Sequence, residues 1–292
     1  MIARMFAVSA VLLCASAWSK PPSKKGGCPG GDFEACFKEG MKAVDTGDEV
    51  KAAKLLEKAC TGGFFRACGP LGTMHAQGHG GLPVNLTKAY ELYASACEAR
   101  SAGGCVYLGR ALLNGHGVKQ DVALGLEKMQ TGCELGEGEG CYLLGTVYEY
   151  GELGVTVDFA RALDWYQKAI DAKAASGQFG LGTMYLLGRG VEVNHALALE
   201  LLGKACTSGE PRACNNLGEM HLKGLGTKKD ASRAADAYER SCKEKEPVGC
   251  QNFALMLDAG RGRPRDKKAA QKHFRFACDH GQQVSCDELK KK

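Results

Sequence analysis

The stretch from residue 206 to residue 214 reads Cys-Thr-Ser-Gly-Glu-Pro-Arg-Ala-Cys and places Cys206 and Cys214 eight positions apart. The same spacing recurs in six other pairs, which are Cys28 with Cys36, Cys60 with Cys68, Cys97 with Cys105, Cys133 with Cys141, Cys242 with Cys250, and Cys278 with Cys286. The first cysteines of successive pairs lie 32, 37, 36, 73, 36 and 36 residues apart, and the interval of 73 residues has room for one additional unit. Self-similarity at a nearly constant interval predicts tandem structural repeats.

The additional unit has no cysteines. Ile170 and Gln178 occupy its two positions, again eight apart. Because both thiols are absent together, we expect the two cysteines of every other pair to be bonded to each other. Zinc is the competing explanation, but the chain has no Cys-x-x-Cys and its seven histidines keep no ligand-like spacing to the cysteines. We therefore predict seven local disulfides, and no metal or other cofactor.

Residues 1–17 have the pattern of a secretory signal peptide. A short cationic start precedes an apolar run from Met5 to Cys14, and Ala15-Ser16-Ala17 fits the small-x-small cleavage pattern. A lipoprotein signal acylated at Cys14 is the alternative, although Leu13 stands where a small residue is expected. Cleavage would remove the odd cysteine and leave an even set, which is typical of disulfides in an exported chain. The sequence therefore predicts a secreted or periplasmic protein.

Each repeat contains two predicted helices. Twelve residues before the first cysteine stands a residue that commonly caps the start of a helix, namely Asp48, Asn85, Asp121, Asp158, Asn194, Asp230 and Asp266. The second cysteine opens the next helix, with apolar and small residues three, four and seven positions later on one face. Ten positions after it stands a glycine, typical of a helix terminus, at Gly78, Gly115, Gly151, Gly188, Gly224 and Gly260. We call the helix before each turn helix B and the one after it helix A.

This organisation predicts an all-α protein, a solenoid of about seven αα-hairpin units stapled by local disulfides. We place the solenoid at residues 28–289, after a disordered leader over 18–27 and before a basic tail at 290–292. A solenoid of this length is reasonable as one domain because each unit packs only on its neighbours.

The repeat resembles a known family. Leu181-Gly182, Tyr185 and Gly188-Arg189-Gly190-Val191, preceded by Asp158, Ala162, Trp165 and Tyr166, are similar to the Sel1-like repeat, a relative of the tetratricopeptide repeat. With a disulfide joining each helix B to the next helix A, the chain also resembles the exported cysteine-rich Hcp proteins. The resemblance covers about residues 28–286, and it departs from the family pattern at the cysteine-free unit and the short first unit.

The resemblance implies two functions of different kinds. Solenoids of this type mostly bind proteins or peptides on a concave face. Hcp proteins are also described as penicillin-binding, with weak β-lactamase activity. The chain contains no Ser-x-x-Lys, Gly-x-Ser-x-Gly or His-Glu-x-x-His motif, so the enzyme hypothesis rests on the resemblance alone. We therefore expect a scaffold without catalytic residues, and keep the hydrolase as the alternative.

The candidate binding residues lie one and two positions after the helix-A cysteine. In tetratricopeptide-type solenoids helix A lines the concave face, so stacked units would bring these positions side by side. The residues predicted to bind a ligand are Tyr107, Tyr142, Phe179, Asn215, Asn216, Gln251 and Asn252. The amides would hydrogen-bond the main chain of an extended peptide and the aromatic rings would add apolar contact. The alternative is that Asn216 and Asn252 cap or bridge neighbouring helices.

The expected partner is a protein or a peptide, with cell-wall peptides as one class. The net charge of +5 is spread through the loops and gathers only at the two ends, so we expect no nucleic acid as a ligand. The apolar run near the start is too short to span a bilayer as a helix, so no transmembrane segment is predicted. We expect the chain to be a monomer.

Overall fold

The computed structural model describes Cys28 and residues 31–291. The predicted signal peptide, its alternative acylation site Cys14 and the leader lie outside the described residues, as does Lys292. The described part is all-helical, with fifteen α-helices and no strand, which confirms the predicted fold class. Within it, every helix is too short or too polar to cross a membrane.

The helices alternate along the chain as predicted. The A helices are α1 (Phe33–Asp45), α3 (Cys68–Gln77), α5 (Ala102–Asn114), α7 (Gly138–Tyr150), α9 (Ala175–Leu187), α11 (Pro211–Lys223), α13 (Pro247–Ala259) and α15 (Gln283–Lys290). The B helices are α2 (Glu49–Thr61), α4 (Leu86–Glu98), α6 (Val122–Glu134), α8 (Phe159–Asp171), α10 (His195–Thr207), α12 (Ala231–Lys243) and α14 (Lys267–Asp279). Three short 3-10 helices complete the elements, η2 (Phe65–Ala67), η3 (His79–Gly81) and η4 (Glu152–Gly154).

The capping residues act as the sequence predicts. All seven predicted N-cap side chains accept a hydrogen bond from the backbone amide three residues later, as Asp158 does from Arg161 at 3.0 Å. This contact satisfies one of the amides that a first helical turn leaves unpaired. The six predicted terminal glycines all adopt the left-handed conformation, with φ between 64° and 75°. The ends of the helices are therefore encoded locally.

The start of helix A differs from the prediction. Except in α3, the A helix begins three residues before its cysteine position rather than at it, so Cys214 is the fourth residue of α11. A single residue in the left-handed region, such as Gly209 or Lys245, turns the chain directly after helix B. The next helix then starts at once. Before α3, the 3-10 helix η2 occupies the three residues that open the other A helices.

The Leu-Gly dipeptide of the repeat has a packing role. A Cβ atom on Gly145 would lie 2.4 Å from the ring of Tyr166, and one on Gly218 would lie 2.6 Å from the ring of Tyr238. Both distances are far below van der Waals contact, so glycine makes room for the tyrosine of the following B helix. Tyr166 and Tyr238 are buried in the core as a result.

All seven predicted cysteine pairs are bonded in the structure, so the predicted register of the repeats is confirmed. Cys28 is bonded to Cys36, Cys60 to Cys68, Cys97 to Cys105, Cys133 to Cys141, Cys206 to Cys214, Cys242 to Cys250, and Cys278 to Cys286. Six of these bonds join the end of a B helix to the next A helix across a tight turn.

The two terminal bonds differ from the inner ones. The first bond ties Cys28, which lies before the start of α1, to Cys36 within α1. Cys36 is buried, like the A-helix cysteines of the inner units, of which Cys141 in α7 is one. Cys286 in α15, in contrast, is only half-buried.

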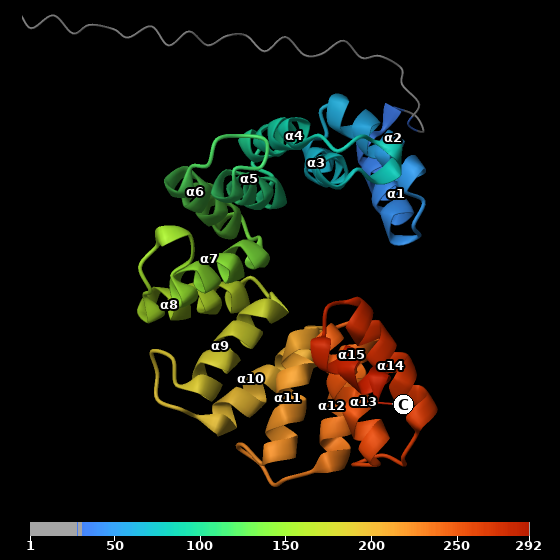
Figure 1. The fold of residues 1–292 in the computed structure, drawn as a ribbon. Coiled ribbons are helices and arrows are strands. Elements are labelled where there is room, and N and C mark those ends of the chain that lie inside the picture. The colour runs from blue at the N-terminus through green and yellow to red at the C-terminus, as the bar shows by residue number, and fades with distance from the viewer. Residues whose placement is uncertain (1–27, 29–30, 292) are drawn as a thin grey trace, which may run out of the picture.

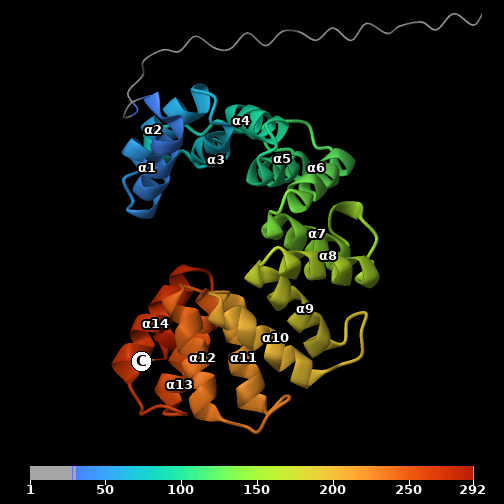
Figure 2. The same cartoon turned by 180° about the vertical axis from the view of Figure 1, so that it is seen from behind.

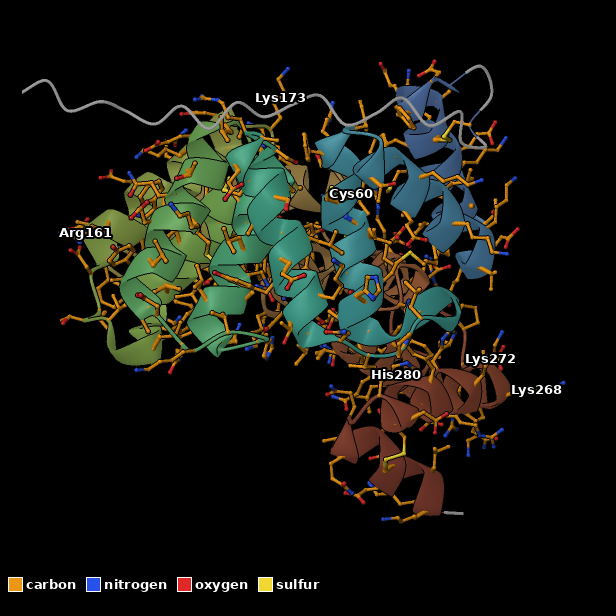
Figure 3. The ribbon with its side chains drawn as sticks, turned by 90° about the horizontal axis from the view of Figure 1, so that it is seen from above. Cys60, Arg161, Lys173, Lys268, Lys272 and His280 are labelled. Atoms are coloured by element: carbon orange, nitrogen blue, oxygen red, sulfur yellow. A yellow bond between two sulfur atoms is a disulfide. The ribbon has the colours of Figure 1, made fainter. Side chains whose placement is uncertain are left out.

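The stacked hairpins form a curved arc (Figure 1). Helices α5 and α7 lie on the inner side of the curve and α6 and α8 on the outer side, and the view from behind shows the same arrangement (Figure 2). Several consecutive A helices contact one another, namely α3 and α5, α5 and α7, α11 and α13 and, most closely, α7 and α9. Exposed basic side chains such as Arg161, Lys173 and Lys268 point away from the ribbon at separate places (Figure 3). From α5 to α8, the inner side of the curve is built from A helices.

Candidate functional site

Stacking of the A helices brings several predicted binding residues together. The residues one and two positions after each helix-A cysteine lie in the first half of α5, α7, α9, α11 and α13. Asn215 of α11 and Asn252 of α13 touch each other, although 37 positions separate them in sequence. Tyr142 of α7 and Phe179 of α9 are also neighbours, with ring centroids 6.4 Å apart. Tyr107 instead stacks on Tyr93 of α4, at 5.3 Å.

The amide side chains form a short row across α11 and α13, and Ser285 of α15 contacts one end of it. The Nδ2 group of Asn252 donates to Oδ1 of Asn215 at 2.8 Å, and the hydroxyl of Ser285 in α15 donates to Oε1 of Gln251 at 3.3 Å. Asn215 in turn donates to Oδ1 of Asn216 at 3.5 Å. All four amide residues are half-buried. A primary amide has two donor hydrogens and an acceptor oxygen with two lone pairs, so these contacts use only part of the capacity of the row.

The aromatic part of the predicted row is arranged differently. Tyr142 is only 6% exposed, and burial raises the pKa of its hydroxyl to about 12. Its ring packs on Tyr166 of α8, with centroids 5.7 Å apart. Phe179 remains half-buried. Tyr142 therefore contributes to the core more than to a ligand surface, while Phe179 and Tyr107 keep part of their rings accessible.

Arg212 covers this aromatic pair, which the sequence analysis did not anticipate. Its guanidinium carbon lies 5.2 Å from the ring centroid of Tyr142 and 4.6 Å from that of Phe179. Nη1 donates to the hydroxyl of Tyr142 at 2.9 Å, while Nε and Nη2 donate to the two carboxylate oxygens of Glu210 at 2.7 and 2.9 Å. These hydrogen bonds raise the pKa of Arg212. The arginine belongs to the quoted Cys206–Cys214 stretch, but nothing local to that stretch indicates an aromatic partner 70 positions earlier.

A buried carboxylate lies in the cysteine-free region. The side chain of Glu149 is 2% exposed and accepts hydrogen bonds from the Tyr166 hydroxyl and from Nη1 of Arg189, each at 2.6 Å. Burial and the neighbouring carboxylate both raise the pKa of Tyr166. The hydrogen bond to Glu149 likewise raises the pKa of Arg189. The three groups satisfy one another, so this cluster has the character of a structural link between α7, α8 and the loop that follows α9.

Among the described residues, one group of potential metal ligands comes close together, namely Cys242, Cys250 and His273. Nδ1 of His273 lies 3.3 Å from Sγ of Cys242. Both sulfurs are joined in a disulfide, so neither is the thiolate that a metal requires. The spacing of the histidines in the sequence does not indicate this contact, because His273 is 31 positions from Cys242 and only the folded chain brings α14 and α12 together there.

Comparison with known proteins gives consistent matches. The family model described as Sel1 repeat matches residues 35–64, 67–101, 102–137, 138–173, 175–210, 211–245 and 248–282. Cytochrome c oxidase assembly factor 7 of Xenopus tropicalis is 28% identical over 146 residues, which are 48% of this chain and 63% of the frog protein. This chain therefore spans less than two thirds of the length of that relative.

Solved structures show the same repeat. A protective antigen present in uropathogenic Escherichia coli strains, which displays an SLR fold, is 25% identical with a TM-score of 0.63, over 89% of this chain and 56% of the antigen. Cysteine rich protein B of Helicobacter pylori is 28% identical over 46% of this chain and 96% of its own, with a TM-score of 0.38. The seven matches to the family model confirm the similarity predicted from the Leu-Gly and Gly-x-Gly elements.

Proposed function

The chain belongs to the Sel1 repeat family, and from this premise we propose that it is an exported scaffold that binds a protein or a peptide along the inner faces of its A helices. The observation that carries the proposal is the amide row. Asn215 and Asn252 lie side by side on consecutive A helices and keep hydrogen-bonding capacity, as main-chain recognition of an extended segment requires.

The disulfides support the proposal through the cost of binding. A groove whose helices are already fixed loses less conformational entropy when a partner docks than one that must first become ordered. Six of the seven bonds each fix one turn between consecutive helices. Disulfides form and persist in oxidising compartments, which supports export to the periplasm or the cell exterior. None of the arrangements described above favours the hydrolase alternative, so we put forward no second function.

The proposal is tested by capture of a partner from the exported proteins of the source cells. The bait is the oxidised mature chain with a photo-crosslinking residue in place of Asn216. We expect a discrete crosslinked partner, and we expect the double variant Asn215→Ala with Asn252→Ala to lose it. The matched control is Gln130→Ala on the outer helix α6, where Gln130 is exposed and bonds only to Glu134 of its own helix.

Three results would contradict the proposal. A partner that is retained equally by the inner and outer variants would place the binding surface elsewhere. Retention of no partner at all would favour a structural spacer. Hydrolysis of a chromogenic β-lactam would show that the chain is an enzyme, provided that the activity copurifies with the protein and survives chelation of metals.

A further inference from the structure

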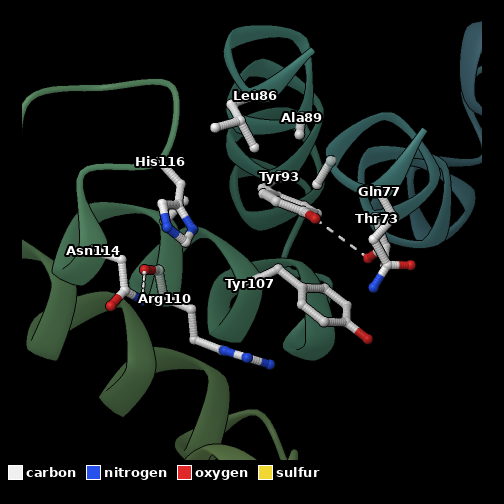
Figure 4. A pocket seen from close by; sticks show the side chains of 11 residues that line it. Thr73, Gln77, Leu86, Ala89, Tyr93, Tyr107, Arg110, Asn114 and His116 are labelled. Carbon is white, nitrogen blue, oxygen red and sulfur yellow. Dashed lines mark hydrogen bonds between the residues drawn. The ribbon is translucent and has the colours of Figure 1, made fainter. Parts of the chain in front are cut away.

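A cavity lies between two consecutive inner helices in the first half of the solenoid (Figure 4). Residues of α3, α4 and α5 line it, together with His116 in the loop after α5. Its volume is about 300 Å³. Tyr107, one of the predicted binding residues, lines it, whereas the amide row on α11 and α13 does not.

The cavity exists because two repeat positions carry unusually small residues there. The sixth residue after the helix-A cysteine is Met74, Val147, Met184, Met220 or Met256 in five of the units, but Ala111 in α5. The eighth is Leu113, Glu149, Leu186, Leu222 or Asp258 elsewhere, but Ala76 in α3. Ala76 and Ala111 both line the cavity. At both positions, therefore, the residue beside the cavity is smaller than its equivalents in the other units.

The lining combines apolar surface with positive charge. Ala76, Ala111 and the rings of Tyr93 and Tyr107 supply apolar walls, and Tyr93 is held by a hydrogen bond from its hydroxyl to Thr73 at 3.3 Å. Arg110 and His116 also line the cavity, and none of the lining residues is acidic. Arg189 and Arg212 are each paired with a glutamate, whereas Arg110 has no such partner in the described part of the chain. Threonine, glutamate or leucine stands at the position of Arg110 in the other units.

We propose that this cavity anchors one large apolar side chain of the bound partner, of leucine or phenylalanine size, and that Arg110 pairs with a carboxylate within one residue of it. The inference rests on the proposed function, because it identifies part of what the inner face recognises. An apolar anchor in a preformed pocket is the usual centre of a binding surface, and an arginine at its rim selects for negative charge. The carboxylate comes either from an aspartate or glutamate or from the end of the polypeptide.

Peptide titrations of the oxidised mature chain, followed by NMR of the ¹⁵N-labelled protein, test the proposal. The probe is the blocked peptide Gly-Ser-Leu-Glu-Ser-Gly, compared with versions that carry Gln for Glu or Ala for Leu. A second pair, Gly-Ser-Gly-Ser-Leu with a free carboxyl or an amide end, distinguishes a terminal carboxylate from a side-chain carboxylate. We expect the acidic peptide whose carboxylate is of the recognised kind to perturb the amides of α3 and α5, and removal of that carboxylate to weaken binding about tenfold.

Variants of the lining complete the test. Ala111→Met restores the side chain of the other units and should abolish binding, and Ala76→Leu is a second way to fill the same space. Arg110→Gln should weaken the acidic peptides about tenfold and leave the Gln peptide unaffected. The matched control is Arg275→Gln on the exposed side of α14, which should bind like the unmodified protein. Thermal unfolding of every variant establishes that it is folded.

The anchor proposal fails if the wild-type protein binds neither acidic peptide at millimolar concentration, or if removal of the carboxylate weakens neither peptide. It also fails if either cavity-filling variant, folded, binds like wild type. These results leave the proposed function standing when a captured partner still depends on Asn215 and Asn252. Conversely, peptide binding in the cavity without any partner on the inner face would support the anchor and refute the scaffold.

Discussion

Two neighbouring turns of the solenoid, each between a helix B and the next helix A, are held by different kinds of link. Between α10 and α11, the Cys206–Cys214 disulfide ties helix B to helix A across eight positions. Between α8 and α9, Ile170 and Gln178 stand at the same positions. At this turn, hydrogen bonds between residues far apart in the sequence take the place of the disulfide. The buried carboxylate of Glu149 holds Tyr166 of α8 and Arg189, which follows α9, and Glu139 of α7 accepts a hydrogen bond from Ser176 of α9 at 2.9 Å.

The comparison teaches how the two kinds of link act. A disulfide that closes a short loop restricts the unfolded chain, and it does so whatever the neighbouring repeats do. A hydrogen-bonded cluster exists only when three helices are already stacked. The cysteine-free unit therefore depends on its neighbours more than the other units do, and the contacts between α7 and α9 are correspondingly close.

Full reduction should have the largest effect. The chain-entropy model assigns about 2.5 kcal/mol to each loop of this size, and seven such losses exceed the roughly 5–15 kcal/mol stability of an ordinary domain. We expect the reduced chain to lose most of its helical signal in far-UV circular dichroism at room temperature. A thiol count must show complete reduction, and helicity retained under that condition would mean that the noncovalent contacts alone hold the repeats.

Glu149→Ala should destabilise the cysteine-free region by about 2–3 kcal/mol, because it leaves the buried hydroxyl of Tyr166 and the guanidinium of Arg189 without their acceptor. The free energy of unfolding from denaturant titration measures the effect. Asp258→Ala is the control, since Asp258 occupies the same repeat position in α13 and only its backbone carbonyl accepts from Arg265. The control should change stability by less than about 0.5 kcal/mol. Equal losses in both variants would mean that the Glu149 cluster is not a special link.

Installing the missing disulfide should offset part of that loss. The double variant Ile170→Cys with Gln178→Cys places thiols in the register of the other seven pairs, so we expect an eighth bond and a gain of up to about 2.5 kcal/mol. Mass spectrometry without reductant detects the bond, and denaturant titration of the double variant in the Glu149→Ala background measures the rescue. A bond that forms without any rescue would show that the two kinds of link do not stabilise the same element.

The smallest expected effect concerns pH. His221 of α11 stands where the cysteine-free unit has Tyr185, and it is 9% exposed with its Nδ1 atom buried and without a hydrogen-bond partner in the described structure. Burial, together with Arg233, lowers the pKa of His221, and Asp230 partly opposes this. The unfolded chain therefore binds the proton more readily than the folded one. The free energy of unfolding is not reduced by His221 above the ordinary histidine pKa, and it falls as the pH drops below that value.

We expect the melting temperature of the wild type to fall by a few degrees between neutral pH and pH 5.5. His221→Tyr, which introduces the residue of the cysteine-free unit, should reduce that dependence. His273, whose pKa burial also lowers, should account for a remaining slope. An unchanged pH profile in the His221 variant would place the acid sensitivity in other groups.

Much of the fold was predictable because its signals are local. An aspartate such as Asp158 caps the helix that follows it directly, and a glycine such as Gly188 ends the helix before it. Each of these local patterns recurs in every inner repeat, so the spacing of the cysteine pairs was enough to align the repeats with one another. The candidate site was predictable to the extent that repetition stacks equivalent positions, as the contact between Asn215 and Asn252 shows.

The amino-acid sequence by itself determined the repeat, the ends of its helices, the partners of its disulfides and which positions would share one face. Only the tertiary structure decided that Glu149 is a buried link, that Arg212 covers Tyr142 and Phe179, and that Ala76 and Ala111 leave a cavity beside Arg110. The physical reason is the distance along the chain over which each interaction acts. Caps, turns and short disulfide loops act within about a dozen residues. Burial, ion pairing and empty space depend on side chains that meet only after the hairpins have curved and stacked against one another.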